Sequence, residues 1–263
     1  MKQLSILLAV ILLLCGCVAP AATAPETTQT QTMAPETTAP VTTVPEAQEP
    51  EVTQPEHSPF YIEGVAVEDV ILWFNEVCLD SEIYHSGDPS VVQKWTEPIR
   101  YSVKGDPTPE DLTVLEGFTQ WLNTVKGFPG IARAQPEEWV NLRINFVDAQ
   151  NLEWIMGPDY SGLDGALTFW YDDDNSIYDC VICVRSDVHQ YLRNSVILEE
   201  LYNGLGPVQD TQLRSDSIIY QQYAEPQSLT EADKLILKLL YHPDMERGMN
   251  AEACEAVIRS LYY

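Results

Sequence analysis

The stretch Val196–Asp210, with the sequence VILEELYNGLGPVQD, carries carboxylate and amide side chains that could act together. On a helix that turns about 100° per residue, its apolar side chains share one face, and Glu199, Glu200 and Asn203 lie on the opposite face. A carboxylate can serve as a general base, and carboxylate or amide oxygens can bind a hard metal ion. The stretch is therefore a metal site, a former metal site, or an ordinary helix and turn whose polar face meets a cleft or solvent.

The segment EELYNGLGPVQ resembles the motif H-E-x-x-H-x-x-G-x-x-H of the metzincin zinc peptidases, with the histidines replaced. In those enzymes two histidines one helical turn apart bind zinc, a glutamate between them activates the bound water, and a glycine turns the chain toward the third ligand. The resemblance implies that Glu199, Asn203 and Gln209 stand at the ligand positions. It also implies that Glu200 stands at the general base and Gly206 at the turn glycine.

Two downstream stretches extend this resemblance. DSIIY is similar to the metzincin Met-turn, with Ile219 in place of methionine and Tyr220 after it, and SLTEADKLILKLLY is similar to the helix that follows that turn. Upstream, Tyr178–Val184 falls where those enzymes carry the edge strand that pairs with substrate. The resemblance therefore implies a degenerate metzincin-like core from which all three histidine ligands are absent.

The altered ligand positions offer poor zinc chemistry. Zinc sites use Cys, His and carboxylate ligands, whereas these positions supply one carboxylate and two neutral amides. Calcium or magnesium sites usually contain more carboxylates. The other histidines outside the linker, His85, His189 and His242, lie outside the motif and form no i, i+4 pair. We expect no metal and no cofactor, so Glu200 would be catalytic only in an active hydrolase with an unusual metal.

Four stretches spread over roughly residues 66–262 resemble a bacterial lipoprotein family catalogued as domain of unknown function 2927 (DUF2927). They are SGDPSVVQKW, PIRYSVKGDPTPED, EELYNGLGPVQDT and LTEADKLILKLLYHPDMERGM. This resemblance implies a fold and a location outside the cytoplasm, and it brings no established activity.

The elements that must position these residues follow from periodicity. Alternating apolar residues predict strands at Ile99–Val103 and Leu142–Phe146, and ALTFWY and IYDCVICV predict a hairpin around the turn DDDNS. That turn lacks the glycine and the later acidic ligand of a calcium loop, so we expect an ordinary solvated turn.

Helical periodicity and capping residues predict the helices. The predicted helices are Ala66–Leu79, one starting at Thr108, one capped by Ser186 or Asp187, one with a capping box of Ser228 and Glu231, and a last one capped by Asn250. The order of elements predicts an α+β fold with α/β-like order. It should contain a small mixed sheet, an edge strand over an active-site-type helix, and C-terminal helices.

Four cysteines lie in the domain. Cys180 and Cys183 are three residues apart on a predicted strand, so they point to opposite faces and cannot bond to each other. Cys78 and Cys254 each fall on the apolar stripe of a predicted helix, where free cysteine packs as a small apolar residue. The sequence leaves open whether Cys78 and Cys254 pair.

The N-terminus predicts a location. Residues 1–17 have a basic start, an apolar run too short to span a membrane, and the sequence Leu14-Cys15-Gly16-Cys17, which resembles a lipobox. We predict a lipid on Cys17 that anchors the protein to the extracytoplasmic face of a bacterial cell membrane; a plain signal peptide is the alternative.

Composition predicts a disordered linker over residues 18–58 and a single domain over 59–263. The linker consists almost entirely of Thr, Pro, Glu, Ala and Gln, and contains too little apolar surface to fold. The whole chain has a net charge of −26 at pH 7, which excludes nucleic acid as a partner and disfavours anionic lipid head groups.

These features together predict a membrane-anchored extracellular lipoprotein with a degenerate, non-catalytic metallopeptidase-like domain. Its cleft or edge strand would bind a peptide, a protein or an envelope component. Two alternatives stay open, an active hydrolase with Glu200 as general base and a structural envelope protein that never uses the cleft.

Overall fold

The computed structural model describes residues 58–79, 90–222 and 225–263 of the chain. The predicted signal peptide 1–17 with Cys17, almost all of the predicted linker 18–58, and His85 lie outside these residues. Within the described part, no helix is long and apolar enough to cross a membrane.

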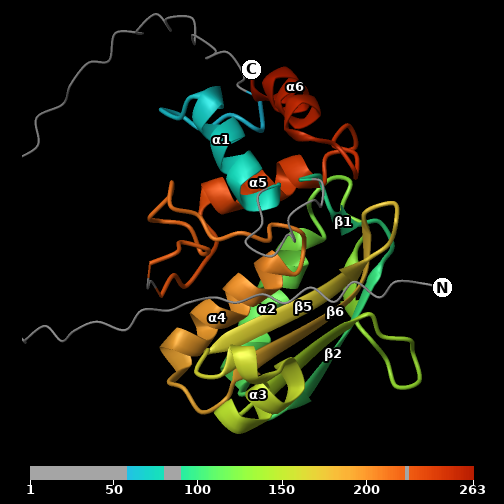
Figure 1. Cartoon of the computed structure of the whole chain (residues 1–263), viewed down its shortest axis with the longest axis vertical. Coiled ribbons are helices and arrows are strands. Elements are labelled where there is room, and N and C mark those ends of the chain that lie inside the picture. Colours follow the sequence, from blue (N-terminus) through green and yellow to red (C-terminus); the bar gives the residue numbers. More distant parts are fainter. Residues whose placement is uncertain (1–57, 80–89, 223–224) are drawn as a thin grey trace, which may run out of the picture. The chain divides into compact units, whose positions relative to one another are not determined.

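The described residues form a mixed α/β domain with one mostly parallel sheet (Figure 1). The strands are β1 (Lys94–Trp95), β2 (Ile99–Gly105), β3 (Ile131–Arg133), β4 (Leu142–Val147), β5 (Gly165–Tyr171) and β6 (Ser176–Arg185). The helices are α1 (Val67–Cys78), α2 (Pro109–Leu122), α3 (Ala149–Met156), the short 3₁₀ helix η1 (Pro158–Tyr160), α4 (Gln190–Asn203), α5 (Glu231–Leu240) and α6 (Ala251–Tyr262). The predicted fold class is confirmed.

Strand β6 organises the sheet. It pairs in parallel with β4 over Cys180–Arg185 and with β1 at its first two residues, and in antiparallel with β5. Strand β2 lies on the far side of β4 and pairs in parallel with both β4 and β3. The predicted hairpin is confirmed, because β5 and β6 join through a turn in which Asp172 Oδ1 accepts from two backbone N–H groups.

The prediction that Tyr178–Val184 is the edge strand is wrong. These residues belong to β6, which has β4 on one side and β5 on the other. On the side of β6 away from β4, the outer strand is β5, which pairs with no other described strand than β6. The nearly continuous apolar run of β6 is typical of a strand buried on both faces, whereas the hairpin signal could not tell which of its two strands is the outer one.

The two faces of β6 carry separate layers of the core. Cys180 and Ile182 belong to the main hydrophobic core with α4, whereas Cys183 packs in a smaller cluster beside α3 and η1. The prediction that Cys180 and Cys183 point to opposite faces is therefore confirmed. All four described cysteines, including Cys78 and Cys254, are buried and free.

A buried ion pair joins the first turns of α2 and α4. Thr108 caps α2, which confirms the predicted start of this helix, and it also forms a capping box with Asp111. Asp111 Oδ1 also accepts from Arg193 Nε at 2.8 Å, with both side chains almost fully buried. Gln190 donates to the same carboxylate oxygen, so the beginning of α4 is fixed against α2.

Two helix caps differ from the prediction. His189 caps α4 in place of Ser186 or Asp187, because Asp187 is bound by the guanidinium of Arg185 and the backbone N–H of Ser186 pairs with β4. Thr230 caps α5 in place of Ser228, and its capping box uses Asp233 rather than Glu231. Asn250 caps α6 as predicted.

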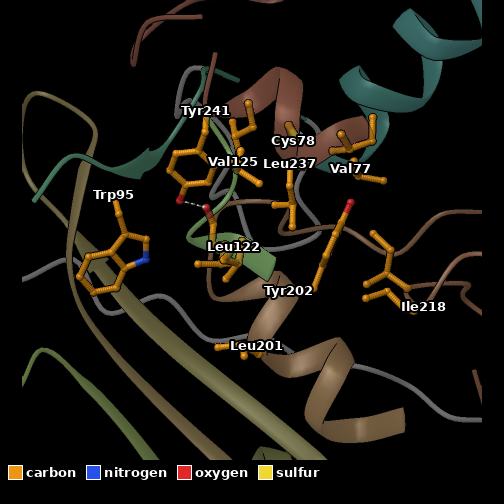
Figure 2. Packing of buried hydrophobic residues seen from close by; sticks show 14 of the residues in the cluster. Val77, Cys78, Trp95, Leu122, Val125, Leu201, Tyr202, Ile218, Leu237 and Tyr241 are labelled. Atoms are coloured by element: carbon orange, nitrogen blue, oxygen red, sulfur yellow. Dashed lines mark hydrogen bonds between the residues drawn. The ribbon is translucent and has the colours of Figure 1, made fainter. Parts of the chain in front are cut away.

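The C-terminal end of α4 packs deep in the main core, which Figure 2 shows around Trp95, Tyr202 and Tyr241. Trp95 Nε1 donates to the carbonyl of Gly204 at 2.8 Å, and the Tyr241 hydroxyl donates to the carbonyl of Leu205 at 2.8 Å. These bonds satisfy the carbonyl groups of the two residues that follow the helix. Gly206 follows with a φ of 125°, a conformation that favours glycine.

Gly206→Ala should destabilise the domain more than an alanine at another positive-φ glycine. A Cβ at residue 206 would lie 2.5 Å from the carbonyl oxygen of Gln93, whereas a Cβ at Gly64, with φ 77°, would meet no atom within 4 Å. Both variants carry a conformational cost of about 1–3 kcal/mol, and only Gly206→Ala adds a backbone clash. Denaturant unfolding of both variants measures the difference, and equal losses of unfolding free energy would contradict the clash.

Candidate functional site

The polar face of α4 is covered rather than solvated. Only 2% of Glu200 and 5% of Asn203 is exposed, whereas Glu199 keeps partial exposure. The helix lies against the sheet through β5 and β6, and residues 210–222 cross its other side. Of the two interpretations of this face, the structure therefore favours a cleft over a solvent face.

Strand β5 passes directly over Glu200. A Cβ on Gly165, the first residue of β5, would lie 2.4 Å from Val196 Cγ1 and 2.5 Å from Glu200 Oε1. Only a glycine allows the strand to come this close, because any side chain would push the strand away from the helix. Gly165 is thus a positioning residue that the sequence analysis missed, although a glycine at the start of a strand is a known sign of close approach.

A small pocket opens beside this contact. It has a volume of about 50 Å³ and lies between the start of β5, the middle of α4 and residues 210–222. That is room for a few water molecules or one small polar group. Its acidic lining residues are Asp164, Glu199, Glu200 and Asp210, and no Lys, Arg or His side chain lines it.

The acidic side chains of the pocket lie near one another, and that of Glu200 is held out of water. Burial raises the pKa of Glu200 well above its ordinary value of 4.5, and the neighbouring carboxyls of Glu199 and Asp210 add to the effect. Burial also raises the pKa of Glu199 to about 8, with further contributions from Asp210 and Asp164. Glu199 is more exposed than Glu200, so burial acts most strongly on Glu200. Burial and the neighbouring acids therefore favour the protonated form of both groups.

Glu200 has one oxygen without a partner. Its Oε2 is buried and makes no hydrogen bond in the structure. Asn203 Oδ1, one turn farther along α4, is also buried without a partner. Buried acceptors are normally satisfied, so such groups mark places where a ligand or water would bind.

The structure brings together only part of the predicted site. Glu199, Glu200 and Tyr220 line the pocket, whereas Asn203, Gln209 and Ile219 do not. Ile219 is buried in the main core and its neighbour Ile218 faces the pocket. Asp210 stands in the lining where the sequence analysis placed Gln209, and no local pattern distinguishes these adjacent residues.

The segment that closes the pocket is fixed from two directions. Asp233, at the start of α5, accepts from the hydroxyl of Ser217 at 2.6 Å and from the backbone N–H of Ile218. Thr211 forms a β-bridge with Tyr220, and its hydroxyl bonds to the Glu76 carboxylate on α1. The floor and the wall of the pocket therefore depend on α5 and α1, which the sequence places far from α4.

The residues present do not fit a zinc ion. Of the three implied ligand positions, only Glu199 lines the pocket, and its raised pKa disfavours the ionised form that a metal requires. Asn203 and Gln209 supply neutral amides. Among residues 58–79, 90–222 and 225–263, no group of three or more His, Cys, Asp or Glu side chains has the arrangement of a metal site.

Comparison with known proteins identifies one relationship. A family model described as "Protein of unknown function (DUF2927)" matches residues 68–260. This range includes every described element from β1 to α5 and all residues that line the pocket. No curated protein and no solved structure matches the chain.

The raised pKa values predict how stability depends on pH. A carboxyl with a raised folded-state pKa contributes stability that is complete below its ordinary value of 4.5 and is lost as the pH rises through the folded-state value, about 8 for Glu199. The unfolding free energy should therefore fall between pH 5 and pH 9. Glu200→Gln should remove on the order of 1–3 kcal/mol of this fall, because the amide cannot ionise.

Urea unfolding at several pH values measures this effect. Glu97→Gln, which changes an exposed acid outside the pocket, serves as the matched control and should keep the wild-type profile. A Glu200→Gln profile that runs parallel to the wild type would show that the Glu200 carboxyl is not held as an acid.

Proposed function

The chain belongs to the DUF2927 protein family, and we propose that it is a lipid-anchored, extracytoplasmic binding protein with a degenerate, non-catalytic metallopeptidase-like domain. Its ligand would be an extended peptide segment, free or part of a larger protein. The segment would add to β5 and lie across the cleft beside α4. Among the described strands β5 pairs only with β6, and its other edge next to this cleft is the observation that carries the proposal.

The backbone of β5 can accept another strand. Arg185 donates its N–H to the carbonyl of Asp164 at 2.9 Å, which makes these two residues a hydrogen-bonded pair. Because such pairs alternate along an antiparallel ladder, Gly165, Leu167 and Phe169 direct their N–H and C=O groups away from β6. A peptide could pair with this row, as in other cases of strand addition.

A peptidase reaction at this site has less support. A general base must be ionised to accept a proton, and burial favours the protonated form of Glu200. The ligand positions implied by the metzincin resemblance offer amides in place of histidines, so nothing there would polarise a peptide carbonyl. The domain would thus keep the cleft of a peptidase and lack its chemistry.

Lipid anchoring supplies the first test. Cys17→Ala should release the protein from the membrane or leave it unprocessed, because the lipid on Cys17 is the proposed attachment. Cys15→Ala, two residues away in the same motif, should remain processed and membrane-bound. Fractionation followed by a high-salt wash measures both variants. A processed Cys17→Ala protein that stays in the membrane would contradict the lipoprotein assignment.

Amide hydrogen exchange tests the β5 edge. Peptides selected from a random display library against the full chain in detergent should protect the amides of Leu167 and Phe169, which face away from β6. The amides of Ala166 and Thr168 already bond to β6, so they serve as internal controls whose exchange should change little.

The same peptides also test for catalysis. Mass spectrometry should find them intact after incubation with the protein, with or without added zinc. Selected peptides that leave Leu167 and Phe169 unprotected would show that binding uses another surface. Cleavage that stops when Glu200→Gln is introduced would establish the active hydrolase instead.

A further inference from the structure

We propose that the pocket beside Glu200 binds one organic cation, an ammonium or guanidinium group, carried by the peptide segment that adds to β5. We call it the acidic pocket and define it by Asp164, Glu199, Glu200 and Asp210. The inference rests on the proposed function, because it identifies the chemistry of the ligand that the cleft would take.

Two acids of the acidic pocket, Glu199 and Glu200, form no ion pair with a base among the described residues. Asp164 is paired with the guanidinium of Arg185 at 2.9 Å. Arg185 also binds Asp187, so it is shared between two acids and lies outside the pocket lining. Buried acids are usually paired with a cation, and among the described residues no base faces Glu199 or Glu200.

Glu200 supplies an independent sign of a missing partner. Only 2% of Glu200 is exposed, so the residue is almost completely buried. It lines the pocket, and its Oε2 makes no hydrogen bond. An ammonium or guanidinium group would supply the donor that this oxygen lacks. A charged donor also forms a stronger hydrogen bond with a carboxylate than a neutral donor does.

The geometry of β5 links the pocket to a bound peptide. Residues directly opposite each other on neighbouring strands point their side chains to the same face of a sheet. Gly165 approaches α4 from this face and directs its backbone groups to the open edge. The peptide residue opposite Gly165 would therefore point its side chain toward α4, beside the contact between Gly165 and Glu200.

The size and the donor arrangement favour an organic cation over a metal ion. A pocket of about 50 Å³ has room for the head group of a lysine or arginine side chain. Within the described part of the chain, the acids do not form a group with the arrangement of a metal site. A flexible side chain can adapt to such a loose arrangement, whereas a metal ion requires several ligands at fixed distances.

Binding should be coupled to the release of protons. The groups near Glu200 are Glu199 on the same helix, Asp164 before β5, Asp210 and Tyr220 on the closing segment, and the buried thiols of Cys180 and Cys183 on β6. Burial and the neighbouring acids raise the pKa of both glutamates and so favour their protonated forms. A cation favours the ionised carboxyls, so its affinity should rise as the pH rises toward about 8, the pKa of Glu199.

Calorimetry on the full chain in detergent tests the inference with matched pentapeptides. The probes are acetyl-Ala-Ala-X-Ala-Ala-amide with X as lysine, arginine or norleucine, together with the norleucine peptide carrying a free N-terminus. At pH 8 the lysine or arginine peptide should bind at least tenfold more tightly than the blocked norleucine peptide. This preference should shrink at pH 6. A preference shown by the free N-terminus instead would assign the cation to a terminal amine.

Variants locate the cation. Glu200→Gln should remove most of the preference for lysine over norleucine, whereas Glu97→Gln, an exposed acid outside the pocket, should leave it intact. Glu199→Gln provides a second variant if Glu200→Gln folds poorly. Equal binding of the lysine and norleucine peptides would overturn the inference. A lysine preference that survives both glutamine variants would also overturn it. So would stoichiometric binding of calcium or zinc that blocks the lysine peptide.

A second probe separates this inference from the proposed function. Butylammonium and butylguanidinium can enter the pocket without adding a strand, and NMR shifts at Gly165 and Glu200 report their binding. Binding of these cations without any peptide protection at Leu167 would support the pocket and contradict strand addition. Protection of Leu167 by lysine and norleucine peptides alike, with no shift from the small cations, would support strand addition and overturn the cation pocket.

Discussion

The contact between Gly165 and Glu200 sets the arrangement of the rest of the site. A carboxyl side chain is held under a strand, within a distance that leaves no room for a Cβ on that strand. Burying an acid in this way is unfavourable, and it persists only when the surrounding structure fixes both partners. On the side of β6 away from β4 the outer described strand is β5, so it can follow the helix without disturbing a second described neighbour. The helix in turn must be unable to move away.

Helix α4 is held at both ends. At its start, the buried pair of Arg193 and Asp111 ties it to α2, and breaking such a pair by removing one partner usually costs about 3–5 kcal/mol. At its end, Trp95 and Tyr241 bind the last carbonyl groups, and Gly206 turns the chain away beneath Gln93. A helix fixed in this way cannot relieve the burial of Glu200 by shifting. The strain stays at the site, where protonation or a ligand can relieve it.

The sequence predicts what depends on local pattern and fails where distant segments decide. The helix over Gln190–Asn203, the β5–β6 hairpin and the opposite directions of Cys180 and Cys183 follow from periodicity, and the structure confirms them. The prediction that Tyr178–Val184 is the edge strand is wrong, because β4 pairs with β6 through long-range packing that no local pattern reveals. Asp210 was missed for a similar reason: its place depends on the bridge between Thr211 and Tyr220 and on the hold of Asp233 on Ser217.

The charge state of Glu200 connects the proposed resemblance to zinc peptidases with the proposed role. In a zinc peptidase the metal ion polarises the substrate, and its positive charge also keeps the nearby glutamate ionised. Under that proposal, Glu199, Asn203 and Gln209 would stand where those enzymes carry histidines, and these residues offer poor donors for such an ion. Without a cation nearby, burial and the neighbouring acids favour the protonated carboxyl of Glu200. A domain of the proposed kind would thus lack an ionised general base as well as metal ligands. Its buried acid would gain a favourable interaction when a cation arrives from outside. A site with these properties is suited to recognising a charged group rather than to cleaving a bond.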